Sequence, residues 1–135
     1  MAVFIAVLLG GLLGTAGNAG GSGSAVPACQ SGRHVVCIGR ADGGHSVHVE
    51  PGQTVTVELG GSGLRWSDLH QVGPRLLHQR GATVVRGGSL VASYLAKGVG
   101  RTGLRASGAP ICAPGQACPQ FIVLWQVRVV VARRD

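Results

Sequence analysis

Residues 45–59 read HSVHVEPGQTVTVEL and contain the clearest structural signal in the chain. Apolar and polar side chains alternate on both sides of the central Pro-Gly, which predicts that Val55, Val57 and Leu59 face inward. A period of two with many β-branched residues is typical of strands. Proline fixes φ at about −65° and glycine accepts a positive φ, so we expect a type II turn at Glu50–Gln53. The stretch therefore predicts two short strands and a tight turn.

Segments with the same alternation recur along the chain, separated by glycine-containing turns at 60–63, 87–88 and 97–100. Outside the N-terminal run, no segment has helical spacing over three turns. Short strands at intervals of about 8–12 residues are typical of a β-sandwich or a barrel, so the fold class is all-β. Beyond residue 59 we expect strands at 64–66, 75–79, 83–85, 90–96, 102–106 and 122–132.

The composition is that of one folded domain. The 135 residues include 24 glycines, 45 % apolar residues and only 13 % charged ones. Such a chain is too apolar and too weakly charged to be disordered, and it is too short for a large multi-domain enzyme. Aromatic residues make up only 4 %, so the core must consist mainly of valine, leucine, isoleucine and alanine side chains.

The N-terminus has the composition of an export signal. Residues 1–16 are largely apolar and fewer than the roughly 20 that a membrane-spanning helix needs. Small residues at 17–19 fit a signal-peptidase site, and the glycine- and serine-rich stretch after them is typical of a flexible linker. We therefore expect a signal peptide at 1–19, a flexible linker at 20–34 and one domain at 35–133, in a protein that is secreted or held in the cell envelope.

Two alternatives for the N-terminus remain open. No lysine or arginine precedes the apolar run, and the segment can also be interpreted as a single-pass signal anchor instead of a cleaved signal peptide. Val26-Pro27-Ala28-Cys29 loosely resembles a bacterial lipobox, which would attach a lipid to Cys29. Proline is unusual in that motif, and Cys29 lies well beyond the apolar run, so we favour a form without a lipid.

The four cysteines form two local pairs in the sequence. In an exported protein we expect a Cys112–Cys118 disulfide that closes the loop before the last strand, and a Cys29–Cys37 disulfide near the start of the domain. Four cysteines allow three connectivities, so cross-pairing remains open. The alternative is a metal site at Cys112 and Cys118 with two histidines. Their separation is a poor match to the spacing of about two to four residues within a zinc-ligand pair, so we expect no metal.

The sequence contains no arrangement of residues that points to catalysis. It has no Gly-x-Ser-x-Gly turn and no phosphate-binding loop that opens a helix. None of the five acidic residues forms a close pair suited to general acid–base chemistry. We therefore expect neither enzymatic activity nor a cofactor.

The net charge of +7 comes from 12 basic and 5 acidic residues. The arginines are scattered along the chain and few aromatic residues are free to stack on bases, so we do not expect nucleic-acid binding. The charge favours electrostatic attraction to anionic polymers of the cell envelope. A structural envelope module that binds such polymers is therefore one hypothesis for the function, and we expect it to be a monomer.

Four motifs in the C-terminal half support a different hypothesis. They are Tyr94-x-Ala96, Gly100, Leu104-x-Ala106 and Trp125-x-Val127-x-Val129-x-Val131. Together with a hairpin at 51–57 they resemble the chagasin-type inhibitors of papain-like cysteine peptidases, over about residues 45–131. Pro110-x-Cys112 and Cys118-Pro119 resemble an exported, actinobacterial-style branch of such domains. The resemblance implies an immunoglobulin-like antiparallel β-sandwich that inhibits an extracellular cysteine peptidase.

The family inhibits through three loops at one end of its sandwich. In the first loop only Trp66 clearly corresponds to the family's Asn-Pro-Thr-Thr-Gly-Tyr-x-Trp segment, and Gly87-Gly88 is a candidate match for the second. The Cys112–Cys118 loop replaces the third and lacks the family's Arg-Pro-Trp segment. For Trp66 and Trp125 we favour packing between the sheets. By fold analogy the candidate contacts are Gly61, Ser62, Gly63, Leu64, Arg65, Trp66, Gly87, Gly88, Pro114 and Gly115.

Overall fold

The computed structural model describes residues 29–61 and 63–134. The expected signal peptide at 1–19, the expected linker as far as residue 28 and the candidate contact Ser62 lie outside the described residues. No helix in the described part is long and apolar enough to cross a membrane. The elements are β1 (Val35–Gly39), the 3-10 turn η1 (Arg40–Asp42), β2 (Ser46–Val49), β3 (Thr54–Leu59), β4 (Leu64–Val72), β5 (Leu77–Arg86), β6 (Ser89–Ala96), β7 (Gly100–Pro110) and β8 (Val123–Val131).

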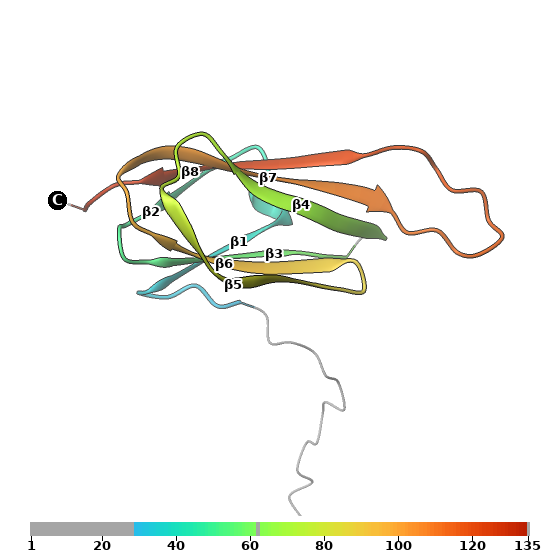
Figure 1. Cartoon of the computed structure of the whole chain (residues 1–135), viewed down its shortest axis with the longest axis horizontal. Helices are drawn as coiled ribbons and strands as arrows, with labels where there is room; N and C mark the ends of the chain where they lie inside the picture. Colours follow the sequence, from blue (N-terminus) through green and yellow to red (C-terminus); the bar gives the residue numbers. More distant parts are fainter. Residues whose placement is uncertain (1–28, 62, 135) are drawn as a thin grey trace, which may run out of the picture.

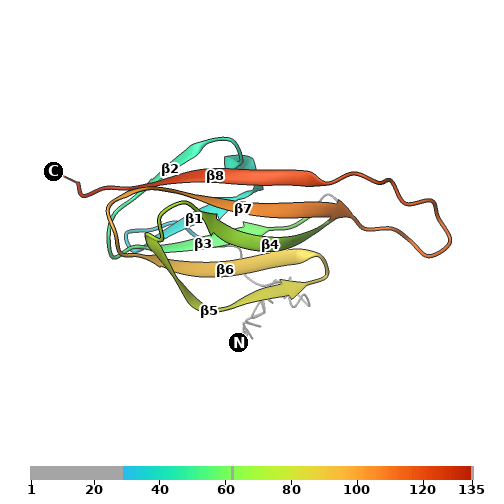
Figure 2. The ribbon, with the colours of Figure 1, turned by 45° about the horizontal axis from the view of Figure 1, so that its top comes forward.

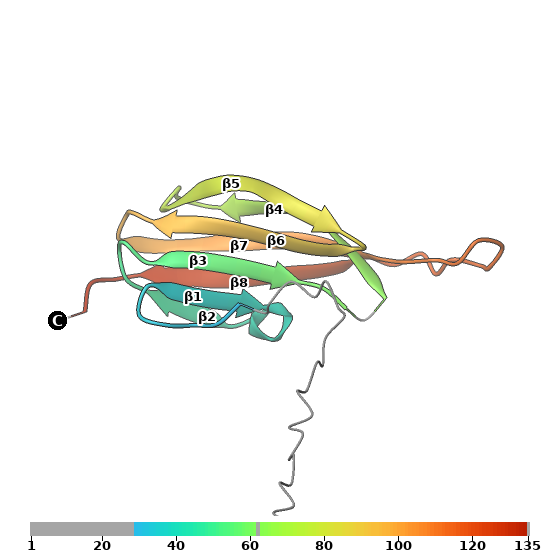
Figure 3. The same cartoon turned by 90° about the horizontal axis from the view of Figure 1, so that it is seen from below.

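The strands form two four-stranded sheets that pack face to face, as Figure 1 shows. One sheet has the order β1-β3-β6-β5 and the other the order β2-β8-β7-β4. Figure 3 shows β4 and β5 along one lateral edge of the sandwich, and β1 and β2 along the other. The immunoglobulin-like β-sandwich that the sequence predicts is confirmed.

Both sheets are mixed, whereas the sequence predicted antiparallel sheets. β1 pairs with β3 in parallel, and β2 pairs with β8 in parallel, while the remaining pairs are antiparallel. The chain crosses from one sheet to the other after β1 and returns after β2. Because each crossing reverses its direction, β1 and β3 lie side by side and run the same way.

The turn at Glu50–Gln53 makes one of these crossings. The main-chain N–H of Gln53 donates to the carbonyl of Glu50 at 3.1 Å, and Gly52 has a φ of 92°, as a type II turn requires. The turn is therefore confirmed. The flanking strands belong to different sheets, so the expected hairpin at 51–57 is wrong. Alternation fixes which side chains face the core but does not determine which strands pair.

The facing surfaces of the two sheets are mainly aliphatic, as the alternation predicted. In β3 the side chains of Val55, Val57 and Leu59 are buried, and β6 buries every second residue in the same way. Trp66 on β4 and Trp125 on β8 are only 0 % and 4 % exposed. Both indoles therefore pack between the sheets, as we favoured from the sequence.

The strands β5 and β1 differ from the sequence-based expectations. The expected strands at 75–79 and 83–85 form one strand, β5, which begins only at Leu77 and whose pairing with β6 shifts between Arg80 and Val84. Gly81 lies in this irregularity with a φ of 74° and lets the strand continue past it. β1 was not expected, because its five residues do not alternate and its partner β3 lies beyond β2 in the chain.

A candidate binding end formed by three loops

Three connections between strands lie at the same end of the sandwich. Residues 60–63 connect β3 to β4, residues 87–88 connect β5 to β6, and residues 111–122 connect β7 to β8. Figures 1 and 2 show all three at the end opposite the C-terminus, with the third projecting furthest. We call these three connections the loop end. They contain the candidate contacts that we predicted from the sequence, apart from Leu64, Arg65 and Trp66, which belong to β4.

Main-chain hydrogen bonds join the three connections. The N–H of Trp66 donates to the carbonyl of Gly88 at 2.9 Å, which links β4 of one sheet to the turn between β5 and β6 of the other. The N–H of Ile111 donates to the carbonyl of Gly63 at 2.8 Å, which links the third connection to the first. The loop end is therefore a single hydrogen-bonded unit to which both sheets contribute.

The close approach at Gly88 depends on the absence of a side chain. A Cβ atom there would lie 2.8 Å from Cδ1 of Ile111 and 3.0 Å from the carbonyl oxygen of Leu64, and the φ of Gly88 is +86°. Gly87 also has a positive φ of +57°, but a Cβ atom on it would meet nothing within 4 Å. A side chain at Gly87 would therefore cause backbone strain alone, whereas a side chain at Gly88 would cause both backbone strain and a steric clash.

We expect Gly88→Ala to destabilise the domain by about 2–4 kcal/mol, since it combines left-handed strain with overpacking. Gly87→Ala is the matched control and is expected to cost only the strain, about 1–2 kcal/mol. Urea unfolding of both variants measures the difference. Equal losses at the two positions would contradict the close packing of the loop end.

Burial divides the candidate contacts into two groups. Leu64 and Trp66 point into the core and Gly88 is covered by its neighbours, so these three offer little surface to a partner in the free chain. They were chosen by alignment to a loop motif, whereas Leu64 and Trp66 already belong to β4. The candidates on the described surface are Gly61, Gly63, Arg65, Gly87, Pro114 and Gly115.

The third connection and the start of β8 also present four apolar side chains that sequence reasoning missed. Ile111 is 46 % exposed, Phe121 51 %, Ile122 69 % and Leu124 72 %. A signal for two of them was present, because Ile122 and Leu124 alternate with the buried Trp125 and so fall on the outward face of β8. Exposed apolar side chains gathered in one segment are typical of a binding surface. We call these four residues the apolar rim.

Both predicted disulfides are present. Cys112 and Cys118, with Cα atoms 5.4 Å apart, close a small ring within the third connection, and Cys29 and Cys37 are joined with Cα atoms 5.9 Å apart. These bonds leave no cysteine sulfur free for a metal ion or a lipid. In the described residues no three or more potential metal ligands gather. Two disulfides in a small domain are typical of an oxidising compartment outside the cytosol.

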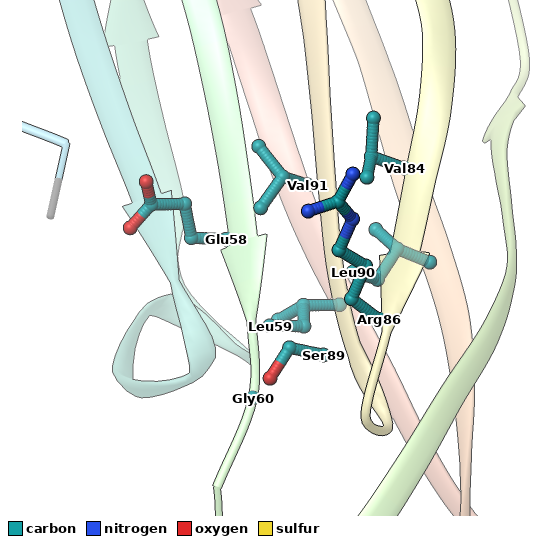
Figure 4. Close-up of a pocket in the computed structure, with 8 residues that line it drawn as sticks. All are labelled: Glu58, Leu59, Gly60, Val84, Arg86, Ser89, Leu90 and Val91. Carbon is teal, nitrogen blue, oxygen red and sulfur yellow. The ribbon is translucent and has the colours of Figure 1, made fainter. Parts of the chain in front are cut away.

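A shallow hollow of about 650 Å³ adjoins the loop end on the outer side of β3, β6 and β5. Figure 4 shows Val84 and Val91 in it, with the guanidinium group of Arg86 close by and Glu58 on the other side of Val91. The Glu58 carboxylate accepts a hydrogen bond from the N–H of Cys29 at 3.0 Å. The mixture of valines and single charges suits binding of a peptide segment rather than chemistry on it.

Burial raises the pKa of Tyr94, the one buried phenol on β6, above its ordinary value. Tyr94 is therefore neutral at physiological pH and acts as a core residue. This agrees with its place in the alternating pattern of β6, where it follows Ala92 on the inward face.

The chain is similar in structure to known proteins. No family model matches the chain, and no curated protein matches it. The crystal structure of the cysteine protease inhibitor EhICP2 from Entamoeba histolytica superposes with a TM-score of 0.53 at 11 % identity, covering 75 % of this chain and 100 % of that one. The solution structure of amebosin gives a TM-score of 0.43 at 13 % identity, with the same two coverages. The likeness to EhICP2 shows that the chain has the fold of that cysteine protease inhibitor, and at the level of the fold the expected resemblance to chagasin-type inhibitors is confirmed.

Proposed function

We propose that the chain inhibits an extracellular papain-like cysteine peptidase by inserting its loop end into the substrate cleft. The main support is the convergence of three connections, from both sheets, into one hydrogen-bonded unit at a single end of the domain. EhICP2, which has the same fold, is a cysteine protease inhibitor. A binding role rather than an enzymatic one agrees with that likeness.

The physical properties of the loop end suit insertion. Gly61, Gly63 and Gly87 have no side chains, so the first two connections form a thin edge that a narrow cleft can admit. The Cys112–Cys118 ring limits the conformations of the third connection before binding. A loop that is already ordered loses less conformational entropy when it binds, and this strengthens the affinity.

The apolar rim supplies surface that a partner can bury. Ile122 and Phe121 each expose half or more of their area to water in the free chain. Burying one large aliphatic side chain is worth about 1.5–3 kcal/mol, or roughly a tenfold change in affinity or more. Because the rim adjoins the thin glycine turns, insertion of the turns would bring it against the walls of the cleft.

Inhibition of papain tests the proposal. We expect competitive inhibition with one chain per enzyme, and we expect Ile122→Ser to raise the inhibition constant about tenfold. Val99→Ser is the matched control, because Val99 is a 58 % exposed aliphatic residue at the opposite end of the sandwich. It is expected to inhibit as the parent chain does. Absence of inhibition at micromolar chain, with papain and with a second papain-like enzyme, would contradict the proposal, as would equal losses in the two variants.

A further inference from the structure

The outward face of the sheet β2-β8-β7-β4 carries a cluster of arginines. Along β7 the side chains of Thr102, Leu104 and Ala106 are buried, so Arg101 and Arg105 point to the opposite, outward side. Along β8 the odd-numbered residues from Trp125 are buried, so Arg128 points outward beside Arg101 and Arg105. These arginines are scattered in the sequence, but the register of β7 and β8 brings the three together on one face.

The cluster surrounds a glycine. Gly103 pairs with Arg128 across the two strands, and it lies between Arg101 and Arg105 along β7. A hollow of about 200 Å³ at the buried Gly103 is lined among others by Arg101, Arg128 and Gln126, and Arg105 lies beside it. Diagonal neighbours in a sheet lie about 7–8 Å apart, so the guanidinium groups of Arg101 and Arg128 can reach one bound anionic group together.

None of the carboxylates of the described residues forms an ion pair with these arginines. Asp42 accepts a hydrogen bond from the N–H of Gly39, Glu58 accepts one from Cys29, and Glu50 lies 3.7 Å from Arg134 in the only ion pair of the described residues. Asp68 is exposed in the bulge of the edge strand β4, two residues before His70, which pairs with Arg105, but it forms no ion pair with Arg105. The three arginines around Gly103 therefore have no carboxylate partner among the described residues, and their charge is available to a ligand.

One member of the cluster is held in place. The guanidinium Nη2 of Arg105 donates to the Oε1 of Gln126 at 3.2 Å, and these two residues face each other across β7 and β8. Arg105 is also partly buried, unlike Arg101 and Arg128. A guanidinium group that is oriented in advance loses less entropy on binding and presents its remaining N–H groups in a fixed direction.

The surroundings indicate the class of ligand. Trp66, Tyr94 and Trp125 are buried, so none of these three rings is free for a nucleic-acid base to stack on. Arg65 also lies on the outward side of β4, opposite Ala109. It extends the row of positive charges along the strands towards the loop end. A row of this kind fits a linear polymer with repeated charges better than it fits a single small ion.

We propose that this cluster binds the sulfate or phosphate groups of an anionic polysaccharide, with one such group over Gly103. The guanidinium fork donates two parallel N–H bonds to the oxygens of these groups, which is the geometry that arginine matches best. The face lies on the side of one sheet and not at the loop end, so both ligands can be bound at once.

Binding of a size-defined heparin octasaccharide, measured by calorimetry at 0.15 M salt, tests the proposal. Arg101→Gln/Arg128→Gln changes two exposed side chains and is expected to weaken binding about tenfold. Arg75→Gln/Arg80→Gln is the matched control, because it lowers the net charge from +7 to +5 in the same way but lies outside the cluster. The control is expected to change binding less than about twofold.

Three results would overturn the proposal. They are the absence of heparin binding by the parent chain, equal weakening in the two double variants, and equally tight, arginine-dependent binding of single-stranded DNA with the same number of charges. Both variants are checked by thermal unfolding and for inhibition of papain. Arg101→Gln/Arg128→Gln is expected to inhibit papain as the parent chain does. The polysaccharide proposal can therefore be wrong while the peptidase proposal stands, and the peptidase proposal can be wrong while the polysaccharide proposal stands.

Discussion

Trp66→Ala is expected to lower the free energy of unfolding by about 3–5 kcal/mol, the usual loss for a large buried aromatic side chain. The Trp66 side chain is fully buried, and a Cβ atom added to Gly108 would lie only 3.1–3.2 Å from its ring atoms. The guanidinium of Arg40 lies 5.8 Å from the ring centroid. Because domains are stable by only about 5–15 kcal/mol, the variant is expected to be marginally folded.

Trp66→Phe is the control that keeps an aromatic ring at this position. The Nε1 of Trp66 is buried and has no hydrogen-bond partner, so its removal costs no hydrogen bond. The Nε1 of Trp125 donates to the carbonyl of Arg40 at 3.3 Å, so Trp125→Phe is expected to lose a bond that Trp66→Phe does not. Guanidinium unfolding of the three variants gives the comparison. A loss below about 1 kcal/mol in Trp66→Ala would contradict the packing of this core.

Removal of the Cys112–Cys118 bond is expected to weaken inhibition of a papain-like peptidase about thirtyfold. In the chain-entropy model, closing a ring of this size reduces the conformational entropy of the free loop by an amount worth about 2 kcal/mol. Without the disulfide, the free energy of binding to a rigid cleft would have to supply that ordering. Cys112→Ser/Cys118→Ser makes the change. The freed segment is also expected to be cut by the peptidase, which mass spectrometry of the products would detect.

Cys29→Ser/Cys37→Ser is the matched control, because it removes the other disulfide, which joins β1 to the segment before it. It is expected to lower stability without changing the inhibition constant, measured well below the unfolding temperature. If both double variants inhibit equally well, the third connection does not insert into the cleft. If both lose inhibition equally, overall stability accounts for the loss.

The features predicted correctly from the sequence are local ones. The alternation in β3, β6 and β8, the turn at Glu50–Gln53 and the two cysteine pairs each depend on residues close together in the chain. Alternation follows from burial of one face of a strand, and a proline-glycine turn follows from the φ values of its two central residues. Such features need no knowledge of which strands pair.

The features that were missed depend on pairing between distant segments. The parallel placement of β1 beside β3 requires two crossings between sheets, which periodicity does not encode. The start of β4 at Leu64 was predicted, but its continuation to Val72 past the bulge after Ser67 depends on pairing with β7. Arg105 and Arg128 lie more than twenty positions apart, and they become diagonal neighbours only through the register of β7 and β8.

Hydrogen–deuterium exchange of the chain in complex with a catalytically inactive papain-like peptidase tests the central proposal most directly. We expect amides at 60–66, 86–89 and 111–123 to exchange more slowly in the complex, while the turns at 50–53, 73–76 and 97–100 at the opposite end are unchanged. Protection at those opposite turns or over the β7–β8 face, with none at the loop end, would contradict insertion of the three connections. So would the absence of any complex at micromolar concentrations.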